Sequence, residues 1–159
     1  DVVRDCGVQT ACAMNVGQLP LLRRKGFTVH GGFGLNVCNG AALDALAELG
    51  VVRQTLSFEL RTAQLRDIDK PIQTEMVVYG HLPLMIFENC AIRNTLLNSK
   101  PLYLADKDDW KKVGAQLGRI CLTTESPERA GEIWQAYTEG REVTFADGFT
   151  RGLYGRGVE

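Results

Sequence analysis

The sequence has no long hydrophobic run, and its first residues do not have the pattern of a signal peptide. None of its apolar stretches approaches the roughly 18 residues that a transmembrane helix requires. The first ten residues, DVVRDCGVQT, lack the basic-then-apolar order of a signal peptide. We therefore expect a cytoplasmic protein without a membrane partner. An initial Met is also missing, and we expect the chain to be a fragment or part of a larger protein.

An excess of charge of either sign is absent as well. Lys and Arg total 18 against 19 Asp and Glu, so the protein has no overall field that would draw it to nucleic acid. Binding to RNA would require a local patch, for which Arg23 to Lys25 with Arg4, Arg151 and Arg156 are the candidates. The apolar content of 45% and the charged content of 23% are those of an ordinary single domain.

The five cysteines include no Cys-x-x-Cys pair. Their odd number and wide spacing argue against a disulfide framework and against a self-contained zinc ribbon. We expect most of them to be buried thiols that pack as small hydrophobic groups. They are Cys6, Cys12, Cys38, Cys90 and Cys121.

Several catalytic and nucleotide-binding motifs are missing. With two histidines in the chain there is no His-Glu-x-x-His, and no Ser-His-Asp constellation is evident. In VHGGFGLN, Gly31, Gly32 and Gly34 do not keep the G-x-G-x-x-G spacing, and no Walker-type lysine follows. We interpret these glycines as sites of close backbone approach near a strand end.

What the sequence does contain is an alternation of strand and helix patterns, which predicts an α/β fold with a parallel sheet. The predicted strands are 10–14, a run beginning at 27, 51–59, 72–79, 100–106 and 119–125. The predicted helices are a short one ending near 26, one following Asn39, 61–68, 107–118 and 126–140. A complete eight-fold barrel takes about 250 residues, so 159 residues predict most of a barrel or an open doubly wound sheet.

Two of these helices carry clear end signals. Asn39 is the expected N-cap of the helix that follows it, and Gly50 falls where a glycine would end that helix. Ser126 is the expected N-cap of the last helix, with Pro127 at its first position. The predicted core-facing stripe of that helix is Ala130, Ile133, Trp134 and Tyr137.

Ligands of parallel α/β sheets bind at the carboxyl ends of the strands. Polar residues gather at these predicted ends. They are Asn15, Asn36, Asn39, Ser57, Glu59, Tyr79, His81, Asp106, Thr123, Thr124 and Glu125. We expect Asn36, Asn39 and Tyr79 to bind substrate, together with Arg151.

Glu59, His81 and Glu88 are the candidates for catalysis, and Cys90 is a candidate metal ligand or nucleophile. Glu59 is either an acid, a base or a ligand, or else a charge that stabilises the start of the next helix. His81 follows Gly80 where a strand leaves the sheet, which favours exposure to a cleft. With Glu88, these two residues could hold a metal-activated water, whereas Cys90 could be a nucleophile with His81 as its base. Glu75 lies within a strand and needs a cationic partner, for which Arg93 and Arg151 are candidates.

Two long stretches resemble the peptidase U32 family, the collagenase-like peptidases. NVCNGAALDALAELGVVRQTLSFEL resembles the family's Asn-Val-x-Asn-Ser … Leu-Gly … Leu-Ser-x-Glu-Leu run, and TEMVVYGHLPLMIFENC resembles its signature region. The YGxLPLMxxENC form is similar to a bacterial subset of the family, as are LNSKPLYLAD, LTTESPERAGEIWQAY and FTRGLYGRGV. The signature places Glu75, Gly80, Leu82 and Cys90 at family positions, whereas Pro83 stands where the first Cys would be.

The resemblance implies an incomplete TIM-barrel-like α/β domain and a hydrolase that cleaves peptide or protein substrates. An alternative that it also implies is an oxygen-independent hydroxylase of RNA bases or another aromatic ring, which uses a [4Fe-4S] cluster with Cys90 as one ligand. A cluster of this kind needs four thiolates. Family members carry more cysteines after ENC, so we expect a missing or deleted loop near residues 93–96. A non-catalytic binding module is the third alternative.

Overall fold

The computed structural model describes residues 2–86 and 95–155. Its helices are α1 (Val2–Asp5), α2 (Gln18–Arg24), α3 (Gly40–Glu48), α4 (Thr62–Asp67) and α5 (Pro127–Glu139), with the 3-10 helices η1 (Phe33–Leu35) and η2 (Asp108–Val113). Its strands are β1 (Thr10–Ala13), β2 (Thr28–Gly31), β3 (Val51–Thr55), β4 (Gln73–Gly80), β5 (Pro83–Ile86), β6 (Thr95–Leu97), β7 (Leu102–Tyr103) and β8 (Leu117–Cys121).

Six strands form one sheet that is mainly parallel. Strands β1, β2, β3 and β4 follow one another in parallel, and β8 pairs with β4, also in parallel. The short β7 pairs with the end of β4 in the antiparallel sense, and β5 and β6 form a separate hairpin. The predicted α/β fold with a parallel sheet is confirmed, except that the predicted strand 100–106 shrinks to β7 and runs antiparallel.

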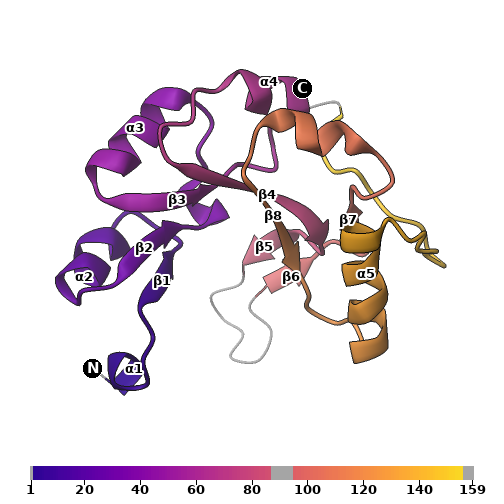
Figure 1. Cartoon of the computed structure of the whole chain (residues 1–159), viewed down its shortest axis with the longest axis horizontal. Coiled ribbons are helices and arrows are strands. Elements are labelled where there is room, and N and C mark those ends of the chain that lie inside the picture. The colour runs from indigo at the N-terminus through magenta and orange to yellow at the C-terminus, as the bar shows by residue number, and fades with distance from the viewer. Residues whose placement is uncertain (1, 87–94, 156–159) are drawn as a thin grey trace.

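Helices α2, α3 and α4 lie along the same side of the curved row β1 to β4, and α5 lies beside β7 and β8 (Figure 1). Leu19 of α2, Leu43 of α3 and Leu65 of α4 lie in one core cluster with buried residues of the strands, whereas α5 contributes Ile133 and Ala136 to a second cluster. Burying side chains of this kind contributes roughly 1.5–3 kcal/mol each. The layer of helices thereby holds the strands in order.

The predicted helix ends are confirmed. Asn39 accepts a hydrogen bond from the Ala42 amide at 2.9 Å, and Gly50, just after α3, has a φ of +80°. Ser126 accepts one from the Arg129 amide at 3.2 Å, and Pro127 is the first residue of α5. Side-chain oxygens at these positions satisfy amides that have no partner within the helix.

Two predictions about the helices were wrong. The predicted helix 107–118 is the short η2, because Gly114 adopts a left-handed φ of +76° and β8 begins three residues later. Trp134 lies on the solvent side of α5 with 62% of its surface exposed, whereas Ile133 and Ala136 are buried. The core-facing stripe is therefore centred one residue away from Trp134.

The glycine-rich turn after β2 is packed as predicted. A Cβ atom at Gly31 would overlap the side chain of Gln54, and one at Gly34 would overlap the carbonyl oxygen of Met14. Glycine is thus required for the close approach of this turn to β1 and β3.

The buried carboxylate of Glu75 joins three strands. Its side chain is 5% exposed, pairs with Arg119 of β8, and accepts a hydrogen bond from the hydroxyl of Thr55 on β3. Arg119 is therefore the partner of Glu75, and the expectation of Arg151 was wrong, because Arg151 pairs with Asp106. Residue 93 lies outside the described part of the chain.

We expect Glu75→Ala to lower the free energy of unfolding by about 1–3 kcal/mol, measured by urea denaturation. The substitution leaves Arg119 without its charged partner. The loss is smaller than for a fully buried pair because the Arg119 side chain is 34% exposed. As the control, Asp67→Asn removes the exposed pair of Asp67 with Arg66 and should leave the urea midpoint unchanged. Equal midpoints for both variants would contradict a stabilising role of Glu75.

Candidate active site

Tyr79 and His81 lie where β4 ends, and Glu125 follows β8. Strands β4 and β8 are parallel neighbours, with Tyr79 opposite Ile120 and Gly80 opposite Cys121. Residues that follow these two strands therefore meet at the same edge of the sheet. This is the carboxyl edge, where α/β folds place their ligands.

The Glu125 carboxylate is held by hydrogen bonds on both oxygens. The Tyr79 hydroxyl donates to Oε1 at 2.9 Å, and the amides of Thr123 and Thr124 donate to Oε2 at 2.6 and 3.0 Å. The side chain is only 5% exposed. Such a set of donors fixes both the position and the charge of a carboxylate.

The environment keeps Glu125 ionised and Tyr79 protonated. Burial raises the pKa of Glu125, but the donated hydrogen bonds outweigh this effect and bring the pKa below its ordinary value of 4.5. Burial, and then the hydrogen bond to Glu125, raise the pKa of the Tyr79 phenol. At neutral pH, Tyr79 is therefore a donor and Glu125 is an anion.

The imidazole of His81 is oriented by a backbone carbonyl. Its Nδ1 lies 2.6 Å from the carbonyl oxygen of Asn98. A carbonyl oxygen only accepts, so Nδ1 carries a proton and the neutral ring presents an unprotonated Nε2. Nε2 lies 3.7 Å from Oε1 of Glu125. This distance exceeds that of a direct hydrogen bond, so Nε2 is available to a group in the pocket.

A pocket of about 390 Å³ opens beside these groups. Its polar and charged lining includes Tyr79, His81, Ser99, Glu125, Arg129 and Asp147. Arg129 is held in place, because it donates to the carbonyl oxygen of Thr144 at 2.8 Å and its guanidinium lies 4.5 Å from the ring centre of Phe145. The pocket thus combines an anion, an imidazole and a fixed cation.

Of the predicted site residues, Tyr79 and His81 come together here, whereas Asn36, Asn39 and Glu59 do not line this pocket. Asn36 accepts a hydrogen bond from the Ser57 hydroxyl at 2.8 Å, and Asn39 caps α3. Glu59 is exposed in the turn between β3 and α4. Their roles in catalysis or binding stay predictions.

Arg151 lies at a different hollow, beside Trp110 and Tyr154. It pairs with Asp106, and its guanidinium lies 5.3 Å from the ring centre of Phe149. Glu88 and Cys90 lie outside the described residues, so their predicted roles as catalytic residue and metal ligand stay predictions.

Three residues of the site were missed as catalytic or binding candidates: Asn98, Glu125 and Arg129. Glu125 had a signal in the sequence, since it was among the polar residues at predicted strand ends. Nothing in the sequence indicated that Asn98, beyond the β5–β6 hairpin, would present its carbonyl to His81. For Arg129, the sequence predicted only a position in the first turn of the last helix, which does not indicate a functional role.

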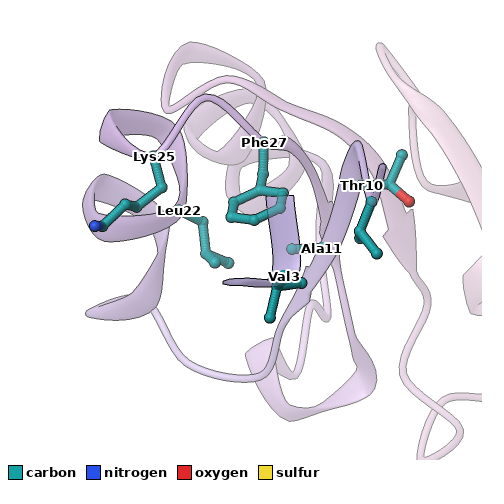
Figure 2. Close-up of a pocket in the computed structure, with 7 residues that line it drawn as sticks. Val3, Thr10, Ala11, Leu22, Lys25 and Phe27 are labelled. Atoms are coloured by element: carbon teal, nitrogen blue, oxygen red, sulfur yellow. The ribbon is translucent and has the colours of Figure 1, made fainter. Parts of the chain in front are cut away.

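A second hollow of about 300 Å³ lies near the amino ends of β1 and β2 (Figure 2). Val3, Leu22 and Phe27 contribute its apolar lining. The ammonium of Lys25 points away from the other labelled side chains (Figure 2). Its lining contains no carboxylate and no imidazole, so it lacks the pair of groups that Glu125 and His81 provide in the other pocket.

The described cysteines do not form a ligand set. Cys6, Cys12 and Cys38 are exposed and Cys121 is half-buried, so the expectation of buried thiols was wrong for three of these four. Cys12 lies on β1, which is an edge strand of the sheet. Within residues 2–86 and 95–155, no three His, Cys, Asp or Glu residues are grouped to hold a metal ion. These residues therefore do not fit an iron–sulfur cluster, and we derive no step through one.

Comparison with protein families identifies the family of the chain. The model of peptidase family U32 matches residues 1–101, which is more than half of the chain. No curated protein and no solved structure matches. In the part of the chain that the structure describes, no helix has the length and apolar character needed to cross a membrane.

The lowered pKa of Glu125 predicts a pH-dependent contribution to stability. A carboxyl group whose pKa is lower in the folded state stabilises the fold above its unfolded pKa, and loses this contribution as pH falls through the folded pKa. We therefore expect the difference in unfolding free energy between wild type and Glu125→Gln to shrink as the pH falls below about 4.5.

Urea denaturation at a series of pH values measures this difference. Tyr79→Phe is the matched variant, because it removes one of the donors to Glu125 and should reduce the pH dependence without abolishing it. A difference that stays constant down to pH 3 would contradict the account of the carboxylate.

Proposed function

Because the chain belongs to peptidase family U32, we propose that it hydrolyses peptide bonds in the pocket of Tyr79, His81 and Glu125. The observation that carries the proposal is the imidazole held by the Asn98 carbonyl beside a buried, ionised carboxylate. An oriented histidine next to a carboxylate is suited to general acid–base catalysis.

In the proposed reaction, Nε2 of His81 takes a proton from a water molecule while the water oxygen bonds to the peptide carbonyl carbon. Glu125 stabilises the resulting imidazolium, because its Oε1 lies 3.7 Å from Nε2 and opposite charges at this distance attract each other. The imidazolium then returns the proton to the amide nitrogen as the carbon–nitrogen bond breaks. The products are a carboxylic acid and an amine, and no other reactant is consumed.

Arg129 and Tyr79 support this reaction in different ways. The guanidinium of Arg129, which also pairs with Glu132, adds positive charge for the carbonyl oxygen, which becomes negative as water attacks. Tyr79 acts as a positioning residue, since its hydroxyl is bound to Glu125. Both side chains are constrained by the fold and lose little conformational freedom when substrate binds.

The sheet also supports a proposal about the architecture. A curved, mainly parallel sheet with helices on one side and its site at the carboxyl edge is the arrangement of a barrel segment (Figure 1). We infer that the described strands form an arc of a TIM-barrel-like domain.

A peptide is favoured over RNA as the substrate. Two arginines of the expected basic patch make contacts within the fold, since Arg23 donates to the Leu49 carbonyl at 2.9 Å and Arg151 pairs with Asp106. These contacts give each guanidinium a role in the fold, whereas the pocket of His81 has the groups needed for hydrolysis.

The test is cleavage of a library of fluorogenic peptides by wild type and by His81→Asn. We expect the substitution to lower kcat by 10²- to 10⁴-fold, roughly the contribution of a general base, with a smaller change in KM. The matched control is His30→Asn, which replaces the other histidine of the chain, on β2 and not among the residues lining the pocket.

Urea midpoints of both variants would show that they are folded. Full activity of His81→Asn on a peptide that the wild type cleaves would contradict the proposed role. Equal losses in the two histidine variants would also contradict it.

A further inference from the structure

His81 also lines an apolar pocket that is separate from the pocket of Glu125. It has a volume of about 210 Å³, and its lining is almost entirely apolar. Its apolar lining includes Phe33, Phe58, Val77, Leu82, Leu97 and Cys121. His81 lines both this pocket and the pocket that contains Glu125.

The apolar wall is assembled from separate parts of the chain. Phe33 in η1 and Phe58 after β3 are in ring contact, with centroids 5.7 Å apart and planes tilted by 54°. Val77 of β4 is 2% exposed. Leu82 and Leu97 come from the two sides of the β5–β6 hairpin, where the Asn98 amide donates to the Leu82 carbonyl at 2.8 Å.

Cys121 and Gly80 shape the part nearest His81. Burial raises the pKa of the Cys121 thiol, so it remains uncharged at neutral pH and packs as an apolar group. Gly80 has a φ of +143°, and a Cβ atom there would lie 2.7 Å from the Cys121 carbonyl oxygen. Glycine at this position therefore allows β4 and β8 to approach closely beside the pocket.

We propose that the apolar pocket binds an apolar, preferentially aromatic, side chain of the substrate next to the bond that reacts. This inference rests on the proposed peptide hydrolysis and deepens it by naming the substrate class. Because His81 lines both pockets, a side chain seated in one brings the adjacent peptide group to Nε2 and Glu125 in the other.

The size and shape of the pocket support a ring as its occupant. An engineered apolar cavity of about 150 Å³ binds benzene, so about 210 Å³ accommodates a phenyl ring. A bound ring would also meet Phe33 and Phe58, and tilted contacts between aromatic rings stabilise by about 0.5–1.5 kcal/mol beyond the burial of area.

The lining disfavours a nucleobase. Bases carry several hydrogen-bonding groups on their edges, and a buried polar group without a partner is destabilising. Of the lining residues, only His81 and Thr123 have polar side chains besides the thiol of Cys121. A phenyl ring leaves no such group unsatisfied.

The test measures the binding of N-acetyl-L-phenylalaninamide to the wild-type chain by NMR titration. N-acetyl-L-alaninamide and cytidine are the comparison ligands. We expect the phenyl ligand to bind at least ten-fold more tightly than either, in keeping with the discrimination that apolar pockets achieve. Cytidine binding as tightly as the phenyl ligand would overturn the inference in favour of a nucleobase.

Leu97→Trp is the variant that fills the pocket, and it should abolish binding of the phenyl ligand. The matched control, Leu122→Trp, adds the same ring at a position that is 49% exposed and outside the pocket lining, and should leave binding unchanged. Leu97→Ala enlarges the pocket and should shift the preference towards a naphthyl side chain. Binding that is indifferent to both Leu97 substitutions would overturn the inference.

These outcomes separate the inference from the proposed function. Binding that depends on Leu97 without any peptide cleavage would support the pocket and count against hydrolysis. Cleavage without phenyl binding, or without preference for an aromatic residue beside the cleaved bond, would overturn the inference and leave hydrolysis supported.

Discussion

The buried carboxylate of Glu75 is the interaction on which the arrangement of the central strands depends. It binds Thr55 of β3 and Arg119 of β8 from its place in β4, so it links three neighbouring strands of different sequence position. An ionised carboxylate inside a sheet is tolerated only with such partners, and a shift of register would separate them. Tyr79 and His81 follow on the same strand, and Glu125 follows the strand of Arg119. The ion pair of Glu75 and the candidate active site therefore depend on the same pairing of β4 with β8.

Much of this unit could be predicted from local patterns. Strand β4 was visible as an apolar run, and its residues are buried from Thr74 to Gly80. Helix α4 and the capped ends of α3 and α5 depend on hydrophobic periodicity and on capping residues, which operate over a few positions. The same logic placed Tyr79 and His81 at a carboxyl edge, because the end of an apolar strand is visible in the sequence. Two of the failures were also local: Gly114 stopped η2 early, and Trp134 faced solvent although its spacing fitted an apolar stripe.

The composition of the site depends on spatial order, which local patterns do not contain. Glu125 meets Tyr79 because β8 pairs with β4, although the β5–β6 hairpin and β7 lie between them in the chain. Asn98 reaches His81 because that hairpin folds back beside β4. Two residues that follow β2 form hydrogen bonds outside the pocket of His81. The side chain of Asn36 accepts a hydrogen bond from the Ser57 hydroxyl, and that of Asn39 caps α3. Glu59 follows β3. His81 lies between a charged pocket and an apolar one, an arrangement that allows one residue both to act as a base and to contact a bound side chain.

The tautomer of His81 is the most direct test of the acid–base account. The nitrogen-15 chemical shifts of its imidazole, recorded by NMR at a pH where the ring is neutral, distinguish a proton on Nδ1 from one on Nε2. The Asn98 carbonyl, 2.6 Å from Nδ1, predicts that Nδ1 carries the proton and that Nε2, facing Glu125, has the shift of an unprotonated nitrogen. A neutral ring with its proton on Nε2 would contradict the account, because that nitrogen could then no longer accept a proton from water.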